Sequence, residues 1–327
     1  MKLSDTGELS LLKRIRERFR VKAKDLIAGI GDDSAIIIPR DRPLLLTTDM
    51  MAEGVHFDLA FTTYFQLGFK IVSVNVSDIY AMGGAPRFVL LDVAAPGGTD
   101  EKMLDSFFEG IQKALGRYHL VLVGGDLSSS KSLAISGTLV GYARKPVTRS
   151  GARPGDRIYV TGNLGDSACG LELLKIMKRP IYIERGDRTN RPLGWATMRP
   201  LLMRHLLPEA RKPGKISGVA TAMIDVSDGL LIDLWRLCDE SGVGARIYMR
   251  QLPVSSQMKK AASFLDLEPD SLAVAGGEDY ELLFTAHPKR RVADAHCIGE
   301  ITDSERIVVE RDGTKRPFSP EGYQHWR

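Results

Sequence analysis

Residues 64–94 read YFQLGFKIVSVNVSDIYAMGGAPRFVLLDVA, and this stretch sets the type of fold. Its first part predicts a helix over about 64–82. The helix has to end there because two glycines and a proline follow within 83–86, and these residues do not continue a helix. The run FVLLDVA at 88–94 then predicts a strand. A helix followed directly by a strand is typical of an α/β protein.

The same alternation extends to both sides of this stretch. A further helix is expected from about residue 99 to 118, with acidic residues in its first turn, where the helix dipole favours them. Strands are expected in AIIIP at 35–39, LLLTT at 44–48, LVLVGG at 120–125 and LAISGTLVGYA at 133–143. The first half of the chain is therefore predicted to contain two helices and about five strands.

A segment rich in proline, glycine and arginine, RKPVTRSGARPGDR, separates this half from a second α/β half. We place the domains at 1–148 and 149–327. In the second half, strands are expected in RIYVTG, AMIDVS, ARIYM, YELLFTA and RIVVE, and helices at 166–177, about 228–241 and 254–264. Residues 178–200 are basic and contain prolines, and we expect a loop there. The predicted fold class is α/β (α+β) with two domains.

Composition excludes several classes of protein. The chain has 327 residues, a net charge of +4 and 43% hydrophobic residues, an ordinary globular balance. Its basic residues are dispersed, which argues against nucleic acid as a partner. No run approaches the roughly 20 apolar residues of a membrane span, so no membrane association is expected. Cys169, Cys238 and Cys297 are far apart, which favours a reducing, cytoplasmic location over a disulfide framework or a zinc site.

Acidic residues recur at the ends of the expected strands. The strand LLLTT is followed by Asp49, LVLVGG by Asp126 and AMI by Asp225. Carboxylates on a shared rim require cations, and Mg²⁺ takes oxygen ligands from carboxylates, water and phosphates. Glycines beside these acids let backbone N–H groups approach phosphate oxygens. The pattern predicts a polyphosphate site bridged by several Mg²⁺ ions.

Simpler explanations remain open for single residues. The pair Asp32-Asp33 lies between glycines and an isoleucine run and is also typical of a turn. Asp228 precedes an apolar helical run, so a helix cap and a metal ligand are equally open for it. Among phosphate-binding folds, a P-loop is excluded because GxxxxGK[ST] is absent, and the protein-kinase motifs HRD and DFG are absent too.

Seven motifs in order resemble the thiamine-monophosphate kinase family of the aminoimidazole ribonucleotide synthetase superfamily. They are GIGDDSA, TTDMMAEGVHF, VNVSDIYAMGG, VGGDLS, TRSGARPGD, IDVSDGL and GGEDYELLF. The resemblance runs from about residue 5 to the C-terminal GYQHW. It implies a kinase that transfers the γ-phosphate of ATP to thiamine monophosphate, the last step of thiamine diphosphate biosynthesis. It also implies a homodimer in which the N-terminal sheets of two subunits pair.

The resemblance also implies roles for single residues. The implied Mg²⁺ ligands are Asp33, Thr47, Thr48, Asp49, Asp78, Asp126, Asp225 and Asp228. The implied ATP contacts are Gly125, Asp126, Arg149 and Ser227, and the implied substrate contacts are His56, Glu278 and Tyr323. No catalytic general base is expected, because the attacking phosphate oxygen is already ionised near neutral pH. Direct in-line transfer then needs charge neutralisation and alignment above all.

Two alternative functions are compatible with the same motifs. One is another ATP-dependent synthetase of the superfamily, of the selenophosphate or purine type, although no cysteine or lysine nucleophile of the selenophosphate kind lies near the N-terminus. The other is a non-catalytic sensor that binds ATP and Mg²⁺. Product analysis separates the first alternative from the kinase, and measurable turnover excludes the second.

Overall fold

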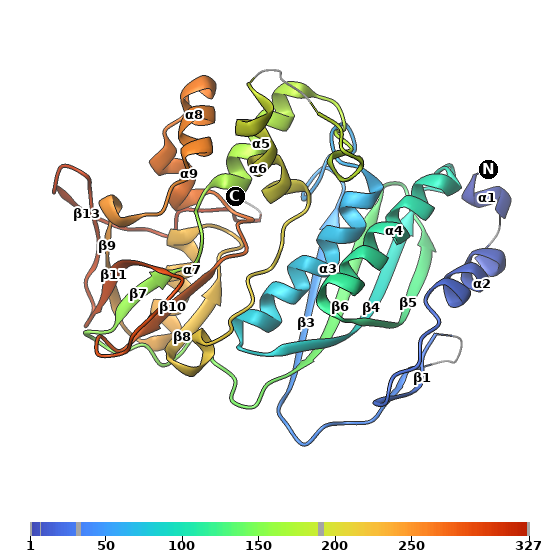
Figure 1. Cartoon of the computed structure of the whole chain (residues 1–327), viewed down its shortest axis with the longest axis horizontal. Coiled ribbons are helices and arrows are strands. Elements are labelled where there is room, and N and C mark those ends of the chain that lie inside the picture. Colours follow the sequence, from blue (N-terminus) through green and yellow to red (C-terminus); the bar gives the residue numbers. More distant parts are fainter. Residues whose placement is uncertain (1, 7, 31–33, 189–192, 326–327) are drawn as a thin grey trace. The chain divides into compact units, whose positions relative to one another are not determined.

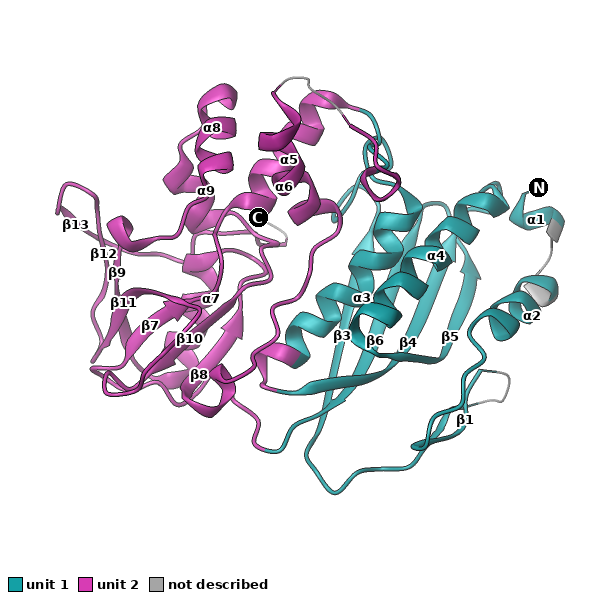
Figure 2. Cartoon of the chain, in the orientation of Figure 1, with its two compact units in different colours: residues 1–79, 84–144, 179–182 teal, residues 80–83, 145–178, 183–327 magenta. Residues whose placement is uncertain are grey.

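The computed structural model describes residues 2–6, 8–30, 34–188 and 193–325 (Figure 1). The chain divides into two compact units, shown in Figure 2. Unit 1 comprises residues 1–79, 84–144 and 179–182, and unit 2 comprises residues 80–83, 145–178 and 183–327. Each unit contains a β-sheet and helices, as the predicted α/β class requires. Among the described residues, no helix is both long and apolar enough to cross a membrane.

Unit 1 is built on a four-stranded sheet in the order β3-β6-β4-β5. Its strands are β3 (Leu44–Ala52), β4 (Ala85–Ala95), β5 (Val121–Ser129) and β6 (Ala134–Tyr142). The β4–β5 pair is parallel, and β6 is antiparallel to both of its neighbours. The predicted strands are therefore present, but β3 and β5 extend beyond Asp49 and Asp126. These two acids lie inside strands rather than at strand ends, because β6 and β4 continue the hydrogen-bonded ladder past them.

Two helices cover one face of this sheet (Figure 1). They are α3 (Tyr64–Ala81) and α4 (Glu101–Tyr118), close to the bounds expected from the sequence. Their backbones touch at two glycines: a Cβ on Gly68 would lie 2.1 Å from the carbonyl oxygen of Phe107, and one on Gly110 would lie 1.9 Å from that of Phe65. This contact fixes α3 over the sheet and with it the side chain of Asp78.

A short hairpin packs on the opposite face of the sheet. Its strands are β1 (Leu26–Ala28) and β2 (Ile36–Ile37), and the helices α1 (Leu3–Thr6) and α2 (Glu8–Arg18) precede it. Residues of the hairpin contact a core that includes Phe88, Val121 and Tyr142. The rest of this face carries the exposed apolar side chains of Leu44, Leu46 and Met50 on β3.

Unit 2 is built on a seven-stranded sheet in the order β13-β12-β9-β11-β7-β10-β8. Its strands are β7 (Arg157–Val160), β8 (Ala220–Asp225), β9 (Gly244–Tyr248), β10 (Leu282–Ala286), β11 (His296–Thr302), β12 (Arg306–Val309) and β13 (Lys315–Pro317). Its helices are α5 (Asp166–Met177), α6 (Trp195–Leu206), α7 (Leu230–Ser241), α8 (Ser256–Leu265) and α9 (Pro269–Ala275). The strand β8 lies at one edge and ends at Asp225.

The prediction of a loop over 178–200 was wrong for its last part, because α6 begins at Trp195. This helix contains Pro200, which cannot donate a backbone hydrogen bond, so its local preference for helix is weak. Tertiary packing overrides that preference. Met198, Leu201 and Leu202 are fully buried, and a Cβ on Gly170 of α5 would lie 2.3 Å from the carbonyl oxygen of Leu201.

Candidate functional site

In unit 1, strand alternation divides the predicted ligands between the two faces of the sheet. Successive side chains of a strand point to opposite faces, so Thr47 and Asp49 lie on one face and Thr48 on the other. On the face covered by α3, the Thr47 hydroxyl donates a hydrogen bond to a carboxylate oxygen of Asp78. The structure thus brings together two of the predicted oxygen ligands from elements 31 residues apart.

Thr48 and Asp126 belong to the opposite face. The Thr48 hydroxyl donates to the carbonyl oxygen of Gly137 (3.1 Å) and accepts from the Thr138 hydroxyl (3.1 Å). Asp126 is aligned across the sheet with Asp92 and with the exposed Met50. Its backbone N–H donates to the Asp92 carboxylate at 2.9 Å. Asp92 was not predicted as a site residue, although an acid inside the apolar strand FVLLDVA was a signal for it.

Gly125 can only be glycine. Its φ of +150° is rare for other residues, and a Cβ there would lie 1.8 Å from the carbonyl oxygen of Leu91. The neighbouring strand β4 occupies the space of the missing side chain, so glycine at this position permits the close β4–β5 pairing beside Asp126, and its role as a phosphate contact stays a prediction.

His56 is held in the turn that follows β3. Its ring Nδ1 accepts a hydrogen bond from the backbone N–H of Ala52 (3.1 Å), and the backbone N–H of His56 donates to the carbonyl oxygen of Ala52 (2.9 Å). Since Nδ1 accepts, a neutral ring carries its hydrogen on Nε2. The ring is therefore oriented as a hydrogen-bond donor at Nε2, a group suited to an anionic oxygen. The remaining unit 1 prediction, Asp33, lies outside the described residues, as does its neighbour Asp32.

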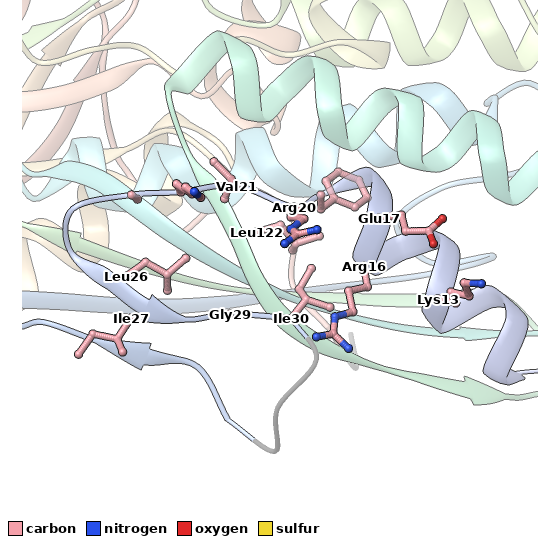
Figure 3. A pocket seen from close by; sticks show the side chains of 13 residues that line it. Lys13, Arg16, Glu17, Arg20, Val21, Leu26, Ile27, Gly29, Ile30 and Leu122 are labelled. Carbon is pink, nitrogen blue, oxygen red and sulfur yellow. The ribbon is translucent and has the colours of Figure 1, made fainter.

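A cavity of about 710 Å³ lies beside Gly29 and Ile30 in unit 1 (Figure 3). Its wall combines the basic residues Lys13, Arg16, Arg20 and Lys22 with apolar residues that include Phe19, Leu26, Ile27 and Leu122. Glu17 is the one acidic residue of the described lining. Such a wall suits a ligand that has both an anionic and an apolar part. The sequence did not indicate this cavity, because its lining comes from α2, the hairpin and β5.

In unit 2, five predicted residues lie in or beside the loop between β8 and α7. The backbone N–H of Glu278 donates to the carbonyl oxygen of Ser227 (2.7 Å), and that of Tyr323 donates to the carbonyl oxygen of Asp228 (2.9 Å). Asp225 is the last residue of β8 and only 3% exposed. Motifs that are separated by about 50 to 100 residues thus meet at one loop.

Asp233 holds this loop and was missed as a functional residue. One of its carboxylate oxygens accepts hydrogen bonds from the backbone N–H groups of Ser227 (3.0 Å), Asp228 (3.1 Å) and Gly229 (3.2 Å). Burial of the side chain raises the pKa of Asp233 to about 6. An acid in the first turn of the otherwise apolar helix LLIDLW was the sequence signal for this role.

Arg236 neutralises both acids of the loop region. Its Nη1 lies 2.7 Å from a carboxylate oxygen of Asp228 and 2.7 Å from one of Asp233. The side chain of Asp228 does not cap α7, whose N-cap residue is Gly229 without a side-chain hydrogen bond. Of the two roles that the sequence left open for Asp228, the cap is therefore wrong.

The motif GGEDYE places three acids in three different surroundings. The carboxylate of Glu278 lies 3.1 Å from Nδ1 of His205, whose ring is buried on α6. The Asp279 carboxylate accepts from the N–H groups of Gly165 (2.6 Å) and Ser167 (3.2 Å) at the start of α5, and burial raises its pKa to about 7. Glu281 is buried and pairs with two arginines. Glu278 and Tyr280 have φ of +64° and +50°, a conformation that costs about 1–3 kcal/mol for a residue other than glycine.

Two arginines and a threonine compensate Glu281. Arg211 binds its carboxylate with two nitrogens at 2.8 and 3.1 Å, Arg204 forms a close ion pair with it, and the Thr161 hydroxyl donates at 2.5 Å. These hydrogen bonds and charges hold the pKa of Glu281 below its usual value in spite of burial. These contacts fix the position of Glu281, and with it the end of the segment that contains Glu278.

Arg149 is not brought to this loop. Its carbonyl oxygen accepts from the hydroxyl of Ser241, the last residue of α7, at 2.9 Å. The predicted partners Ser227 and Asp228 lie at the other end of that helix, and twelve residues span about 18 Å. Within unit 2, the backbone of Arg149 is therefore separated from the other predicted ATP contact.

The described side chains do not by themselves form a complete metal centre. In the part of the chain that the structure describes, no group of three or more His, Cys, Asp or Glu side chains could hold a metal ion. The donors that do meet, a threonine hydroxyl and a carboxylate, are oxygen atoms, which Mg²⁺ prefers. A thiolate nucleophile is not offered either at Cys169 or at Cys238, because burial raises the pKa of each thiol to about 12.

Both halves of the chain match known domain families. Residues 31–143 match the family described as AIR synthase related protein, N-terminal domain, and residues 153–312 match its C-terminal domain. A thiamine-monophosphate kinase from Aquifex aeolicus is 38% identical over 331 residues and covers 100% of both chains. One from Escherichia coli (strain K12) is 36% identical and covers 98% of each.

A solved structure is similar over the whole chain. It is AaThiL complexed with AMPPCP and TMP, which has 36% sequence identity and a TM-score of 0.78. The similarity covers 100% of this chain and 99% of that one. The two α/β domains expected from the sequence are thus confirmed by the family matches and by the fold of a protein solved with two ligands.

Proposed function

This chain belongs to the thiamine-monophosphate kinase family of AIR synthase related proteins, and on that premise we propose that it transfers the γ-phosphate of ATP to thiamine monophosphate. The products are thiamine diphosphate and ADP. The observation that carries the proposal is a full-length relative at 36% identity whose solved complex holds AMPPCP and TMP. AMPPCP is an ATP analogue, so that complex pairs a nucleotide with the second substrate.

The acidic residues offer the oxygen ligands that Mg²⁺ prefers, and they support the proposal that the protein binds Mg²⁺. We propose that Thr47, Asp49 and Asp78 in unit 1 are Mg²⁺ ligands and, separately, that Asp225 and Asp228 in unit 2 are Mg²⁺ ligands, with substrate phosphates completing the coordination in each case. Mg²⁺ is usually bound by one or two carboxylates, with water and phosphate in the remaining positions, so a complete side-chain cage is not needed. When bound, it would neutralise the charge of the two phosphate groups that have to approach each other.

The chain's own residues then have to align the two substrates. We propose that the backbone of Gly125 contacts the phosphates of ATP and that the basic cavity beside Gly29 offers them positive charge. His56, oriented to donate from Nε2, suits the phosphate of thiamine monophosphate. The attacking phosphate oxygen is ionised near neutral pH, so an in-line transfer requires no general base.

Glu278 and Tyr323 are proposed to contact the rings of the substrate. A carboxylate repels a phosphate, whereas the thiazolium ring of thiamine is positively charged, so electrostatics places Glu278 on the ring side. Tyr323 is tethered through its backbone to Asp228 and packs its ring edge-to-face against that of His325, and we propose that the exposed part of the ring, 44% for the residue, stacks on the substrate rings.

We also propose a homodimer formed through the sheet of unit 1. On β3, Leu44, Leu46 and Met50 are 51, 66 and 62% exposed and lie on one face of the strand. Exposed apolar side chains in a row are typical of an interface. Sedimentation equilibrium of the protein and of Leu46→Glu tests this, since a monomeric wild type contradicts the dimer.

The test of the proposed function is a product assay. The purified protein is incubated with thiamine monophosphate, ATP and Mg²⁺, with a control that contains EDTA, and the products are separated by chromatography. Equal amounts of thiamine diphosphate and ADP, formed only with Mg²⁺, are expected. Turnover of ATP without thiamine diphosphate would favour another synthetase of the superfamily, and ATP binding without turnover would favour the sensor.

A further inference from the structure

Glu278 is held from two sides by groups of unit 2. Its backbone N–H donates to Ser227, and its carboxylate oxygen Oε2 lies 3.1 Å from Nδ1 of His205. A carboxylate without a proton only accepts hydrogen bonds, so we assign a hydrogen to Nδ1 of His205, which it can donate to Glu278. The hydroxyl of Ser167 lies 3.2 Å from the same nitrogen. His205 is 5% exposed, while the Glu278 side chain retains 29% exposure.

The backbone at Glu278 is forced into this position. Glu278 and Tyr280 both have positive φ, and the residues around them are anchored to other elements. Asp279 is bound to the start of α5, and Glu281 is bound to Arg204 and Arg211. Non-glycine residues keep such a conformation only where the surroundings impose it, and this occurs mainly at ligand sites.

We propose that His205 is a positioning residue for the substrate contact made by Glu278, an inference that rests on the proposed function. The Nδ1–H group of His205 fixes one carboxylate oxygen and so orients the carboxylate toward the positively charged ring of thiamine monophosphate. His205 does not itself contact the substrate, because its ring is buried on α6 beneath Glu278. A histidine-fixed carboxylate is pre-ordered, and less conformational entropy is lost when the ring binds.

The test compares four variants. His205→Phe removes the donor and keeps a ring, whereas His205→Asn places an amide donor near the position of Nδ1. Glu278→Gln removes the negative charge, and the double variant Glu278→Gln/His205→Phe measures coupling. His287→Asn is the matched control, because this histidine of unit 2 is exposed and its Nδ1 accepts a hydrogen bond from the nearby backbone N–H of Lys289.

Two readouts are needed: the Kd for thiamine monophosphate by calorimetry without ATP, and KM for each substrate with kcat. We expect His205→Phe to raise Kd and KM for thiamine monophosphate about tenfold, the usual effect of losing a charged hydrogen bond, with KM for ATP within about twofold of wild type. His205→Asn should recover most of the affinity. In the Glu278→Gln background, His205→Phe should add little.

Three outcomes would overturn the proposal. They are wild-type affinity in His205→Phe, equal increases of KM for both substrates, and additive effects of His205→Phe and Glu278→Gln. If His205→Phe does not fold, as judged by circular dichroism, the comparison of His205→Asn with wild type and His287→Asn decides. Failure of the proposed function is recognised separately, because the wild type itself would then neither bind nor phosphorylate thiamine monophosphate.

Discussion

In unit 1, Asp49, Asp78 and Asp126 retain contact with solvent, whereas in unit 2 Asp233, Asp279 and Glu281 are buried. The buried acids receive backbone N–H groups or arginines, as burial of a carboxylate requires. The exposed acids lie on strands and a helix beside oxygen donors. The three buried acids therefore stabilise the fold of unit 2, whereas the three solvent-accessible acids of unit 1 are available for the proposed role as metal ligands. The following predictions test that division.

The largest effect is expected where a buried ion pair is broken. Arg204→Met leaves the Glu281 carboxylate with Arg211 and Thr161 only, and removing one partner of a buried pair costs about 3–5 kcal/mol. Urea unfolding followed by circular dichroism measures this loss. A variant with wild-type stability would show that Arg211 alone compensates the charge of Glu281 and that Arg204 is not needed for it.

The next effect is on catalysis without loss of stability. Asp78→Asn keeps the size of the side chain and removes its charge, and we expect kcat to fall about a hundredfold or more, since charge stabilisation is the main catalytic contribution in phosphoryl transfer. The urea midpoint should change little, because Asp78 is only partly buried. Near wild-type turnover would contradict the assignment of Asp78 as a metal ligand. Asp270→Asn, at an exposed pair in unit 2, is the control.

The contributions of two buried carboxylates to the free energy of unfolding should change with pH in opposite directions. Hydrogen bonds from Arg87 hold the pKa of Asp25 well below its usual value of 3.8, so its stabilising contribution is present above that value and is lost as pH falls. Burial raises the pKa of Asp279 to about 7, so the stability associated with its protonated form is lost as pH rises from 3.8 to about 7.

Urea midpoints of wild type, Asp25→Asn and Asp279→Asn between about pH 3 and 8 measure both signs. The advantage in urea midpoint of the wild type over Asp25→Asn should shrink toward low pH. The urea midpoint of the wild type relative to that of Asp279→Asn should fall as the pH rises toward neutral. By linkage, the change should be on the order of 1 kcal/mol by pH 3 for Asp25 and about 4 kcal/mol by pH 8 for Asp279. Slopes of the same sign would show that one of the two surroundings has been misassigned.

The smallest effect is expected at an exposed pair. Arg311 binds Asp270 with two nitrogens at 2.6 and 2.8 Å, a geometry as good as that of the buried pairs. Solvent screens this pair, so Arg311→Gln should cost at most about 1 kcal/mol. Comparison with Arg204→Met then separates burial from geometry. A cost equal to that of Arg204→Met would mean that geometry, and not burial, sets the strength of these pairs.

Much of the fold could be read from local patterns. The helices α3, α4, α5 and α7 and most strands were predicted because apolar periodicity, acidic first turns and glycine or proline stops are local signals. The helices α2 and α9 and the start of α6 were missed. In α6, Pro200 and neighbouring basic residues weaken the local signal, and only contact with α5 makes the helix favourable.

The sequence by itself determined the family, the order of the α/β elements and the motifs that carry the acids, because these properties reside in short stretches and their spacing. The residues that hold those motifs in place are defined by the folded chain. Asp233 beneath Ser227, His205 beside Glu278 and Arg204 on Glu281 are contacts of that kind. The contacts of Glu278 with His205 and of Glu281 with Arg204 join residues more than 70 positions apart. Local sequence patterns do not predict contacts at that separation.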